Sequence, residues 1–395
     1  MITGTLTASS AAAQPAAAFF DPSRLQEIRL WINSRDLRDL RARYRDDTYY
    51  TADFQWQNIR IRNVGIRSRG VASRSSVKLA LRVDFDRYTT GQQFLGLKSV
   101  VLKNLWQDGS MLHERLAMQL FARLGQPASR ESFCRLYINN EYQGLYSIVE
   151  SVDEAFLART VGESDGYLFG YQFREPYRGD YLGDEMDAYR RLFEPQNHER
   201  ESDVALYGPI RELLREVNHQ EDAAWRQRVE EYLDLNQLVT HVAIENFLAE
   251  EDGVLGSNGM NNFFLYRYEG TSRHRVIPWD KDSSFQGPDF PILHRADDNV
   301  IVSKLLSFPD LRALYFGVLE ESARVAADAE REGDAGWLEV EIVRAADLIA
   351  EAVREDTRKS FSTDAFFESI EMLRDFARRR PLYVLEQVRL ARSGR

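Results

Sequence analysis

The sequence is poor in cysteine, and it lacks closely spaced histidines and long apolar runs, which excludes several common protein classes. It contains a single cysteine, Cys134, in 395 residues, which excludes a disulfide within the chain and a zinc site built on several cysteines. Its six histidines show no HExxH or similarly close spacing, which argues against a zinc hydrolase. No run of about 18 apolar residues occurs, so the sequence predicts no transmembrane segment.

Basic excess and the common nucleotide-binding motifs are also missing. The net charge of −11 argues against a general nucleic-acid binder, so no nucleic-acid partner is expected. Without a GxxxxGK[ST] segment the chain does not match a P-loop NTPase, and it has neither the GxGxxG, HRD nor DFG motif of ordinary protein kinases. A hydrophobic content of 44% and a charged content of 29% are ordinary for a globular protein.

The first twenty residues, MITGTLTASSAAAQPAAAFF, differ in composition from the rest. They are rich in alanine and serine and lack the basic start of a signal peptide. We expect residues 1–20 to be a disordered leader or the remnant of a secretory sequence.

The remaining pattern predicts two lobes in an α+β fold. Residues 21–153 are rich in strand-like segments with one prominent helix, 110–124, and alternation such as Leu79, Leu81, Val83 and Phe85 is typical of half-buried strands. Residues 154–395 are predicted to be mainly helical apart from one hairpin. A β-rich N-lobe before a mainly helical C-lobe is the architecture of protein kinases.

That hairpin, within residues 250–284, is the most informative segment. Asp252 lies in a glycine-rich turn, Asn261 and Asn262 begin a predicted strand, 263–268, and Asp280 and Asp282 follow a second strand, 275–279. Carboxylate and amide oxygens are the ligands that Mg²⁺ prefers. A carboxylate, then an asparagine, then an aspartate is also the order in which protein kinases present the base and two metal ligands. Asp, Asn and Gly are equally the commonest turn residues, so a solvated hairpin is the alternative.

Several longer segments resemble one known family. They are SVVLKNLWQDGSMLHERLAMQLFARLG, RLYINNEYQGLYSIVESVD, NNFFLYRY, RVIPWDKDSSF and, nearer the N-terminus, GIRSRGVASRSSVKLALRVDF. Over residues 28–285, and with the family's order along the chain preserved, they resemble the CotH family of atypical, spore-coat-type protein kinases. The resemblance implies an atypical kinase-like two-lobed fold, binding of ATP with Mg²⁺ or Mn²⁺, and phosphoryl transfer to protein serine or threonine. It favours a secreted, cell-envelope or spore-surface location.

The resemblance also assigns roles to residues of the hairpin. Asp252 matches the catalytic carboxylate, which accepts or orients the acceptor hydroxyl. Asn262 matches the metal-binding asparagine, with Asn261 as its neighbouring alternative. Asp280 matches the aspartate that holds Mg²⁺ on the ATP phosphates. Asp282 serves a second metal or caps the following turn.

Residues of the N-lobe complete the nucleotide site implied by the resemblance. The segment 69–78, RGVASRSSVK, takes the place of a phosphate-covering loop and contributes Ser76. Lys78 would meet the α- and β-phosphates, with Glu114 as its carboxylate partner. Glu150 would line the nucleotide pocket, or it is a salt-bridged glutamate at a strand end.

Three functions remain open at this point. The complete set of acid, asparagine and aspartate favours an ATP- and Mg²⁺-dependent kinase acting on protein. The sparse phosphate loop, and His113 where the family often has arginine, favour a non-catalytic coat or envelope scaffold that binds partners. A nucleotidyl or small-molecule transferase would use the same site differently.

Overall fold

A computed structural model describes residues 13–219 and 224–394 of the chain. The chain divides into two compact units, each assembled from separate stretches of sequence. The first unit comprises Met1–Met111, Ser129–Arg159 and Val343–Ile370, and the second comprises Leu112–Ala128, Thr160–Ile342 and Glu371–Arg395.

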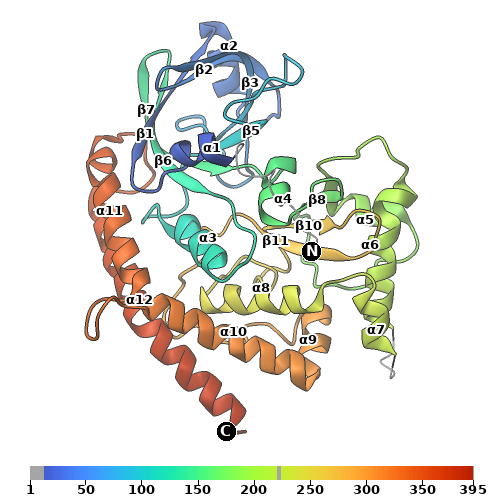
Figure 1. Cartoon of the computed structure of the whole chain (residues 1–395). Coiled ribbons are helices and arrows are strands. Elements are labelled where there is room, and N and C mark those ends of the chain that lie inside the picture. The colour runs from blue at the N-terminus through green and yellow to red at the C-terminus, as the bar shows by residue number, and fades with distance from the viewer. Residues whose placement is uncertain (1–12, 220–223, 395) are drawn as a thin grey trace, which may run out of the picture. The chain divides into compact units, whose positions relative to one another are not determined.

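Strands dominate the first unit. Its elements in chain order are α1 (Ala13–Phe19), β1 (Leu25–Ile32), α2 (Ser34–Ala42), β2 (Tyr50–Trp56), β3 (Ile59–Ser68), β4 (Leu81–Asp84), β5 (Ser99–Lys103), β6 (Glu131–Ile138), β7 (Glu141–Glu150) and α4 (Glu154–Thr160). Figure 1 shows the strands curving around a common interior. The alternating residues Leu79, Leu81, Val83 and Phe85 are all buried there, as their spacing predicts.

Seven strands close into a barrel in the order β1-β2-β3-β4-β5-β7-β6. Each neighbouring pair is antiparallel except β1 and β6, which run parallel from Leu25↔Phe133 to Leu30↔Ile138. Closure gives the backbone N–H and C=O groups of every strand a neighbour, so the sheet has no open edge.

Aromatic side chains fill the barrel interior. The ring of Phe94 lies 4.9 Å from those of both Phe19 and Phe54, in edge-to-face contact. Phe19 ends α1, is fully buried, and its carbonyl accepts a hydrogen bond from Ser132 Oγ at 2.8 Å. The predicted leader therefore ends in the barrel core, while residues 1–12 of it lie outside the described residues.

A buried ion pair joins residues 343–370 to the barrel. Lys78 Nζ lies 2.6 Å from Asp356 Oδ2, and both side chains are fully buried. The same Asp356 oxygen accepts the Leu145 N–H at 3.0 Å. Gly144 has φ +116, and a Cβ there would lie 2.5 Å from the Asp356 carboxylate, so only glycine leaves room for it.

The second unit contains most of the helices. Its elements, including two helices that cross the unit boundary, are α3 (His113–Arg123), β8 (Tyr167–Tyr171), α5 (Met186–Arg190), β9 (Phe193–Pro195), α6 (Asp203–Asn218), α7 (Trp225–Glu230), α8 (Leu235–Phe247), β10 (Phe263–Arg267), β11 (His274–Pro278), α9 (Val300–Ser307), α10 (Pro309–Ala327), α11 (Trp337–Glu355) and α12 (Thr363–Arg392). Figure 1 shows α10 running alongside α8. In the described part of the chain, no helix is long and apolar enough to cross a membrane.

The predicted hairpin is present and belongs to a larger sheet. Strands β10 and β11 pair antiparallel from Phe263↔Pro278 to Arg267↔His274. They extend to β8 and β9 in the order β11-β10-β8-β9. The antiparallel register brings the residue before β10 close to the residues after β11, as the sequence pattern predicts.

The predicted fold class is wrong. We expected a two-lobed protein-kinase-like fold with a β-rich N-lobe and a mainly helical C-lobe, whereas the strands of the first unit form a closed barrel and a four-stranded sheet lies among the helices. Alternation shows which face of a strand is buried but does not identify its neighbour. The β1–β6 pair that closes the barrel joins segments far apart in sequence, and no local pattern reveals it.

Candidate functional site

The candidate site is built around the loop that follows α8. Glu250 Oε1 accepts the Asp252 N–H at 2.8 Å and thereby fixes the turn. Asp252 Oδ2 accepts hydrogen bonds from Nδ2 of Asn261 at 3.0 Å and of Asn262 at 2.9 Å. Because both amides donate through nitrogen, their Oδ1 atoms face away from Asp252. The two asparagines thus orient the carboxylate and keep their own oxygens for other groups.

Asn262 precedes β10 and Asp280 follows β11 by two residues, so both lie at the open end of the hairpin, where Trp279 is the residue opposite Asn262. The Trp279 N–H donates to the Asn262 carbonyl at 3.2 Å. Asn262 and Asp280 both have left-handed backbone, with φ 56 and 52. Asn and Asp adopt this conformation more readily than other residues with a side chain, and Asn139 and Asn140 in the turn between β6 and β7 also have it. The two residues that the resemblance assigns to metal binding therefore have turn-type backbone next to the strand ends.

A buried ion pair beneath these residues connects three segments. Lys281 Nζ lies 2.6 Å from Glu245 Oε1 and donates to the Asn262 carbonyl at 2.9 Å. Glu245, on α8, accepts the Val254 N–H through its other oxygen at 2.9 Å. A Cβ on Gly253 would lie 2.5 Å from the Glu245 carboxylate, so the loop passes directly over this pair. The pair fixes the loop, the start of β10 and the segment of Asp280 relative to each other.

Both members of this pair are charged. Burial alone would raise the pKa of Glu245, but the Lys281 ammonium and the neighbouring His241 lower it to about 2. Burial alone would lower the pKa of Lys281, but the carboxylates of Glu245 and Glu250 raise it above its ordinary value. Each charge thus stabilises the other in a place where water does not reach.

Two other carboxyl groups are shifted upward. Burial raises the pKa of Asp252, and the charge of Asp280 raises it further, while the hydrogen bond from Asn261 and the charge of Lys281 oppose the rise. Burial raises the pKa of Glu250 to about 7, although Lys281 and a hydrogen bond from Ser284 oppose this. Asp252 and Asp280 are therefore close enough for their charges to repel.

Asn262 and Asp280 supply oxygen ligands that suit a magnesium ion bound together with phosphate. Among the residues that the structure describes, no group of three or more His, Cys, Asp or Glu side chains could hold a metal. The two residues instead supply one carboxylate and one amide oxygen, and a cation held there would offset the repulsion between Asp280 and Asp252. Mg²⁺ is usually held by one or two carboxylates with phosphate oxygens and waters as its other ligands.

Two further predicted residues lie in the same unit. His113 Nδ1 is 2.9 Å from the Asp282 carbonyl, and its ring packs 5.3 Å from that of Phe285, so the segment of Asp282 contacts the start of α3. Glu114 is the next residue of α3 and is buried. The second unit therefore contains Asp252, Asn262, Asp280, Asp282 and Glu114.

The other predicted residues belong to the first unit. Lys78 has the buried partner Asp356 described above. Ser76 is exposed. Glu150 ends β7 and is buried, and its carboxylate forms ion pairs with Arg130 at 2.6 Å and Arg159 at 2.5 Å. The contacts of Glu150 match the salt-bridged alternative of the sequence analysis.

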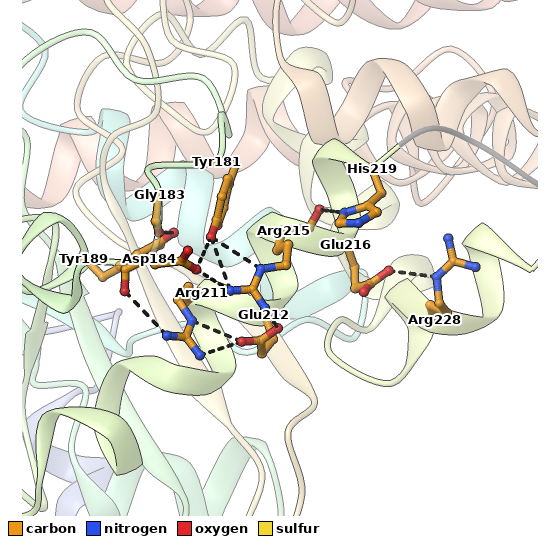
Figure 2. A network of polar contacts seen from close by, with 10 residues as sticks. All are labelled: Tyr181, Gly183, Asp184, Tyr189, Arg211, Glu212, Arg215, Glu216, His219 and Arg228. Carbon is orange, nitrogen blue, oxygen red and sulfur yellow. Dashed lines mark hydrogen bonds and ion pairs between the residues drawn. The ribbon is translucent and has the colours of Figure 1, made fainter.

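A strap, residues 177–184, supports the far side of the glycine-rich loop. A Cβ on Gly259 would lie 2.6 Å from the Tyr177 nitrogen, and the Met260 N–H donates to the Tyr177 carbonyl at 2.8 Å. Figure 2 shows how α6 holds the other end of the strap: Arg215 contacts the Tyr181 hydroxyl at 3.3 Å and Asp184 Oδ1 at 2.5 Å. The loop that carries Asp252 is therefore held from two sides.

Sequence reasoning missed the residues that support the site. Lys281 stands between Asp280 and Asp282, where a lysine suggests a solvated charge, and only the fold places it against Glu245. Asp356 is separated from Lys78 by 278 positions. The sole local signal was Gly253, whose position after Asp252 indicates a close backbone approach.

Breaking the buried pair should destabilise the protein more than removing the pair altogether. We expect Lys281→Met to lower the free energy of unfolding by about 3–5 kcal/mol, because Glu245 is left buried without its counter-ion. The double variant Glu245→Gln/Lys281→Met should lose less than the sum of the single losses in urea unfolding. Lys98→Met, which breaks the half-exposed Lys98–Glu154 pair, is the matched control and should lose about 1 kcal/mol or less. Additive losses at Glu245 and Lys281 would contradict the assignment.

Glu250 should make stability depend on pH. Its pKa is about 7 in the folded protein and near the ordinary 4.5 in the unfolded chain, so the folded state binds more protons between these values. The stability that Glu250 contributes therefore falls as the pH rises from about 4.5 to about 7. We expect the melting temperature of Glu250→Gln, relative to the native protein, to increase over this range.

Thermal unfolding across pH measures this difference. Glu269→Gln, at an exposed position in the β10–β11 turn, controls for the loss of one carboxylate. A difference between Glu250→Gln and the native protein that stays constant with pH would refute the prediction.

Two comparisons with known proteins identify the family of this chain. The family described as "CotH kinase protein" matches residues 66–384. The chain is also 23% identical over 376 residues to "Inner spore coat protein H" of Bacillus subtilis (strain 168), covering 93% of this chain and 98% of that protein. The family match spans both units, including the hairpin and the buried pair, and this chain therefore belongs to the CotH kinase protein family.

Proposed function

We propose that this protein transfers the γ-phosphoryl group of ATP to a serine or threonine hydroxyl of another protein. The observation that carries the proposal is the convergence of Asp252, Asn262 and Asp280 at the open end of one hairpin. Membership of the CotH kinase protein family supports it.

Asp252 is proposed to receive the proton of the acceptor hydroxyl. In the reaction the acceptor oxygen forms a bond to the γ-phosphorus, the bond from that phosphorus to the β–γ bridging oxygen breaks, and ADP leaves. Burial raises the pKa of Asp252, which makes it a better proton acceptor than an exposed aspartate. The amides of Asn261 and Asn262 orient it, and orientation matters most for a loose transition state.

Asp280 and Asn262 would hold Mg²⁺, and Mn²⁺ suits the same oxygen ligands. When bound with ATP, the metal neutralises charge on the phosphate oxygens. The Glu245–Lys281 pair keeps the two ligands in place because Lys281 is bonded to the Asn262 carbonyl and adjoins Asp280. Asp282 is proposed as a ligand of a second metal.

The serine-rich segment 69–78 is proposed to contact the phosphates. Three hydrogen bonds hold it: Arg74 Nε donates to the Gly70 carbonyl at 2.5 Å, and Asn104 Nδ2 donates to the carbonyls of Ser73 and Lys78, each at 2.8 Å. Lys103, the last residue of β5, directly precedes Asn104 and is partly exposed. Because Lys78 is buried against Asp356, we propose Lys103 as the lysine that contacts phosphate.

A structural role in the spore coat is the second candidate. It is favoured by the name of the relative, "Inner spore coat protein H". In that case the protein would bind coat partners at the spore surface, with or without nucleotide. Transfer of a nucleotidyl group, or of phosphate to a small molecule, would use the same residues.

Labelled ATP tests the proposed activity. With γ-labelled ATP, Mg²⁺ and casein as a generic acceptor, we expect label on protein serine or threonine and none from α-labelled ATP. Asp280→Asn should reduce the transfer by more than about 100-fold, because it removes a direct metal ligand rather than an outer partner. Asp297→Asn, at an exposed position of the same unit, is the matched control and should retain transfer.

Each other result selects another function. Label from α-labelled ATP would indicate nucleotidyl transfer. Binding of MgATP without transfer to casein or to the protein itself would select the coat scaffold. Full transfer by Asp280→Asn would refute the proposed site.

The two lysines should respond differently to substitution. Lys78→Met leaves Asp356 buried and unpaired, so we expect a loss of stability of about 3–5 kcal/mol. Lys103→Met should leave the melting temperature of the free protein nearly unchanged. It should abolish the increase in melting temperature that MgATP produces in the native protein. Lys78→Met/Asp356→Asn restores neutrality and should still bind MgATP. Loss of nucleotide binding in that double variant, with binding kept in Lys103→Met, would assign the phosphate contact to Lys78.

A further inference from the structure

Helix α8 ends just before the Asp252 loop without a positive charge of its own. Its last turn contains no basic residue. The final carbonyls of a helix have no partner within it, and they form the negative end of the helix dipole. A buried helix end of this kind requires donors from elsewhere in the chain.

Arg380 of α12 supplies donors to two of these carbonyls. It is fully buried, and its guanidinium donates from Nη2 to the Asn246 carbonyl at 2.5 Å and from Nε to the Phe247 carbonyl at 2.9 Å. From Nη1 it also reaches the carbonyls of Pro288 at 3.1 Å and Phe290 at 2.5 Å. One planar group therefore bonds the end of α8 to residues 288–290.

Arg380 remains charged in this position. Burial lowers its pKa to about 10, although the neighbouring Tyr383, Tyr315 and Asp289 oppose this. A group with this pKa is protonated at neutral pH, so a positive charge faces the negative end of α8. The four carbonyls that it contacts replace the water that such a charge would otherwise bind.

The two segments that Arg380 joins lead directly to the site. Residues 248–252 connect the end of α8 to Asp252, and residues 280–287 connect Asp280 to Pro288. The segments also bond to each other, because the Phe285 N–H donates to the Leu248 carbonyl at 2.7 Å. Phe376, one turn before Arg380 on α12, packs edge-to-face on Phe285 with ring centres 5.0 Å apart.

We infer that Arg380 is a positioning residue that sets the distance between Asp252 and Asp280. The effect of Arg380 on catalysis rests on the proposed function. Its effect on the two segments rests on the contacts of Arg380 alone. A displacement of about 1 Å at a reacting group costs about 100-fold in rate. Arg380 thereby makes the second-unit part of α12 a support of the site, although α12 contributes no residue to it.

Hydrogen–deuterium exchange tests the inference without nucleotide. Arg380→Lys keeps the charge but cannot donate to four carbonyls at once. We expect the amide exchange rates of residues 248–252 and 285–290 to rise at least about tenfold, while those of α6 stay unchanged. This pattern would indicate local rather than global opening. Arg379→Gln, whose arginine is exposed and pairs with Asp375, is the matched control and should leave exchange unchanged.

Kinetics provides the second readout. Where the native protein transfers phosphate, Arg380→Lys should lower kcat at least about tenfold with KM for ATP within about twofold, because geometry rather than nucleotide binding is disturbed. Exchange that rises equally throughout the second unit, or a variant that does not fold, would make Arg380 a general core residue and overturn the inference. Unchanged exchange in both segments would also overturn it. If the native protein transfers no phosphate, the proposed function fails while the exchange result still decides the role of Arg380.

Discussion

The buried pair between Glu245 and Lys281 is the interaction on which the candidate site depends. Two unpaired charges in that position would be costly, and each is tolerable only because the other lies 2.6 Å away. Replacing a buried pair by apolar residues often leaves stability unchanged, so a gain in stability does not explain its presence. What the pair specifies is geometry: through Val254 and the Asn262 carbonyl it fixes the Asp252 loop against the strand end beside Asp280.

Helix α8 is the rigid element from which this geometry is set. Glu245 lies on the helix, Asp252 follows its C-terminus, and Arg380 closes that terminus from α12. The strap contacts the same loop at Gly259 and Met260 through Tyr177. A site that needs accuracy of about 0.5 Å is best supported by rigid elements and by second contacts of this kind. The loop is rich in glycine for close approach to its supports rather than for flexibility, as Gly253 and Gly259 show.

Local sequence patterns predicted the hairpin, but they could not predict which distant segments pair. Asn262 and Asp280 could be placed together from sequence because antiparallel strands joined by a short turn have only a few possible registers. The parallel pairing of β1 with β6 has no such constraint, so the closed barrel was missed. Lys78 was assigned to phosphate because the resemblance gives its segment that role, and the fold adds a contact that the segment does not indicate, the buried pair with Asp356. Burial of a lysine depends on tertiary contacts, and composition carries no sign of them.

The charges at the site suit the phosphotransfer that we propose. Asp280 raises the pKa of Asp252, so the two charges repel each other. A cation held by Asp280 and Asn262 would offset this repulsion, whereas the burial that raises the pKa of Asp252 would persist. The hydrogen bonds from Asn261 and Asn262 fix the direction of the Asp252 carboxylate. For a loose transition state this orientation matters more than base strength, so the supports of the loop bear on the proposed reaction more directly than the pKa does.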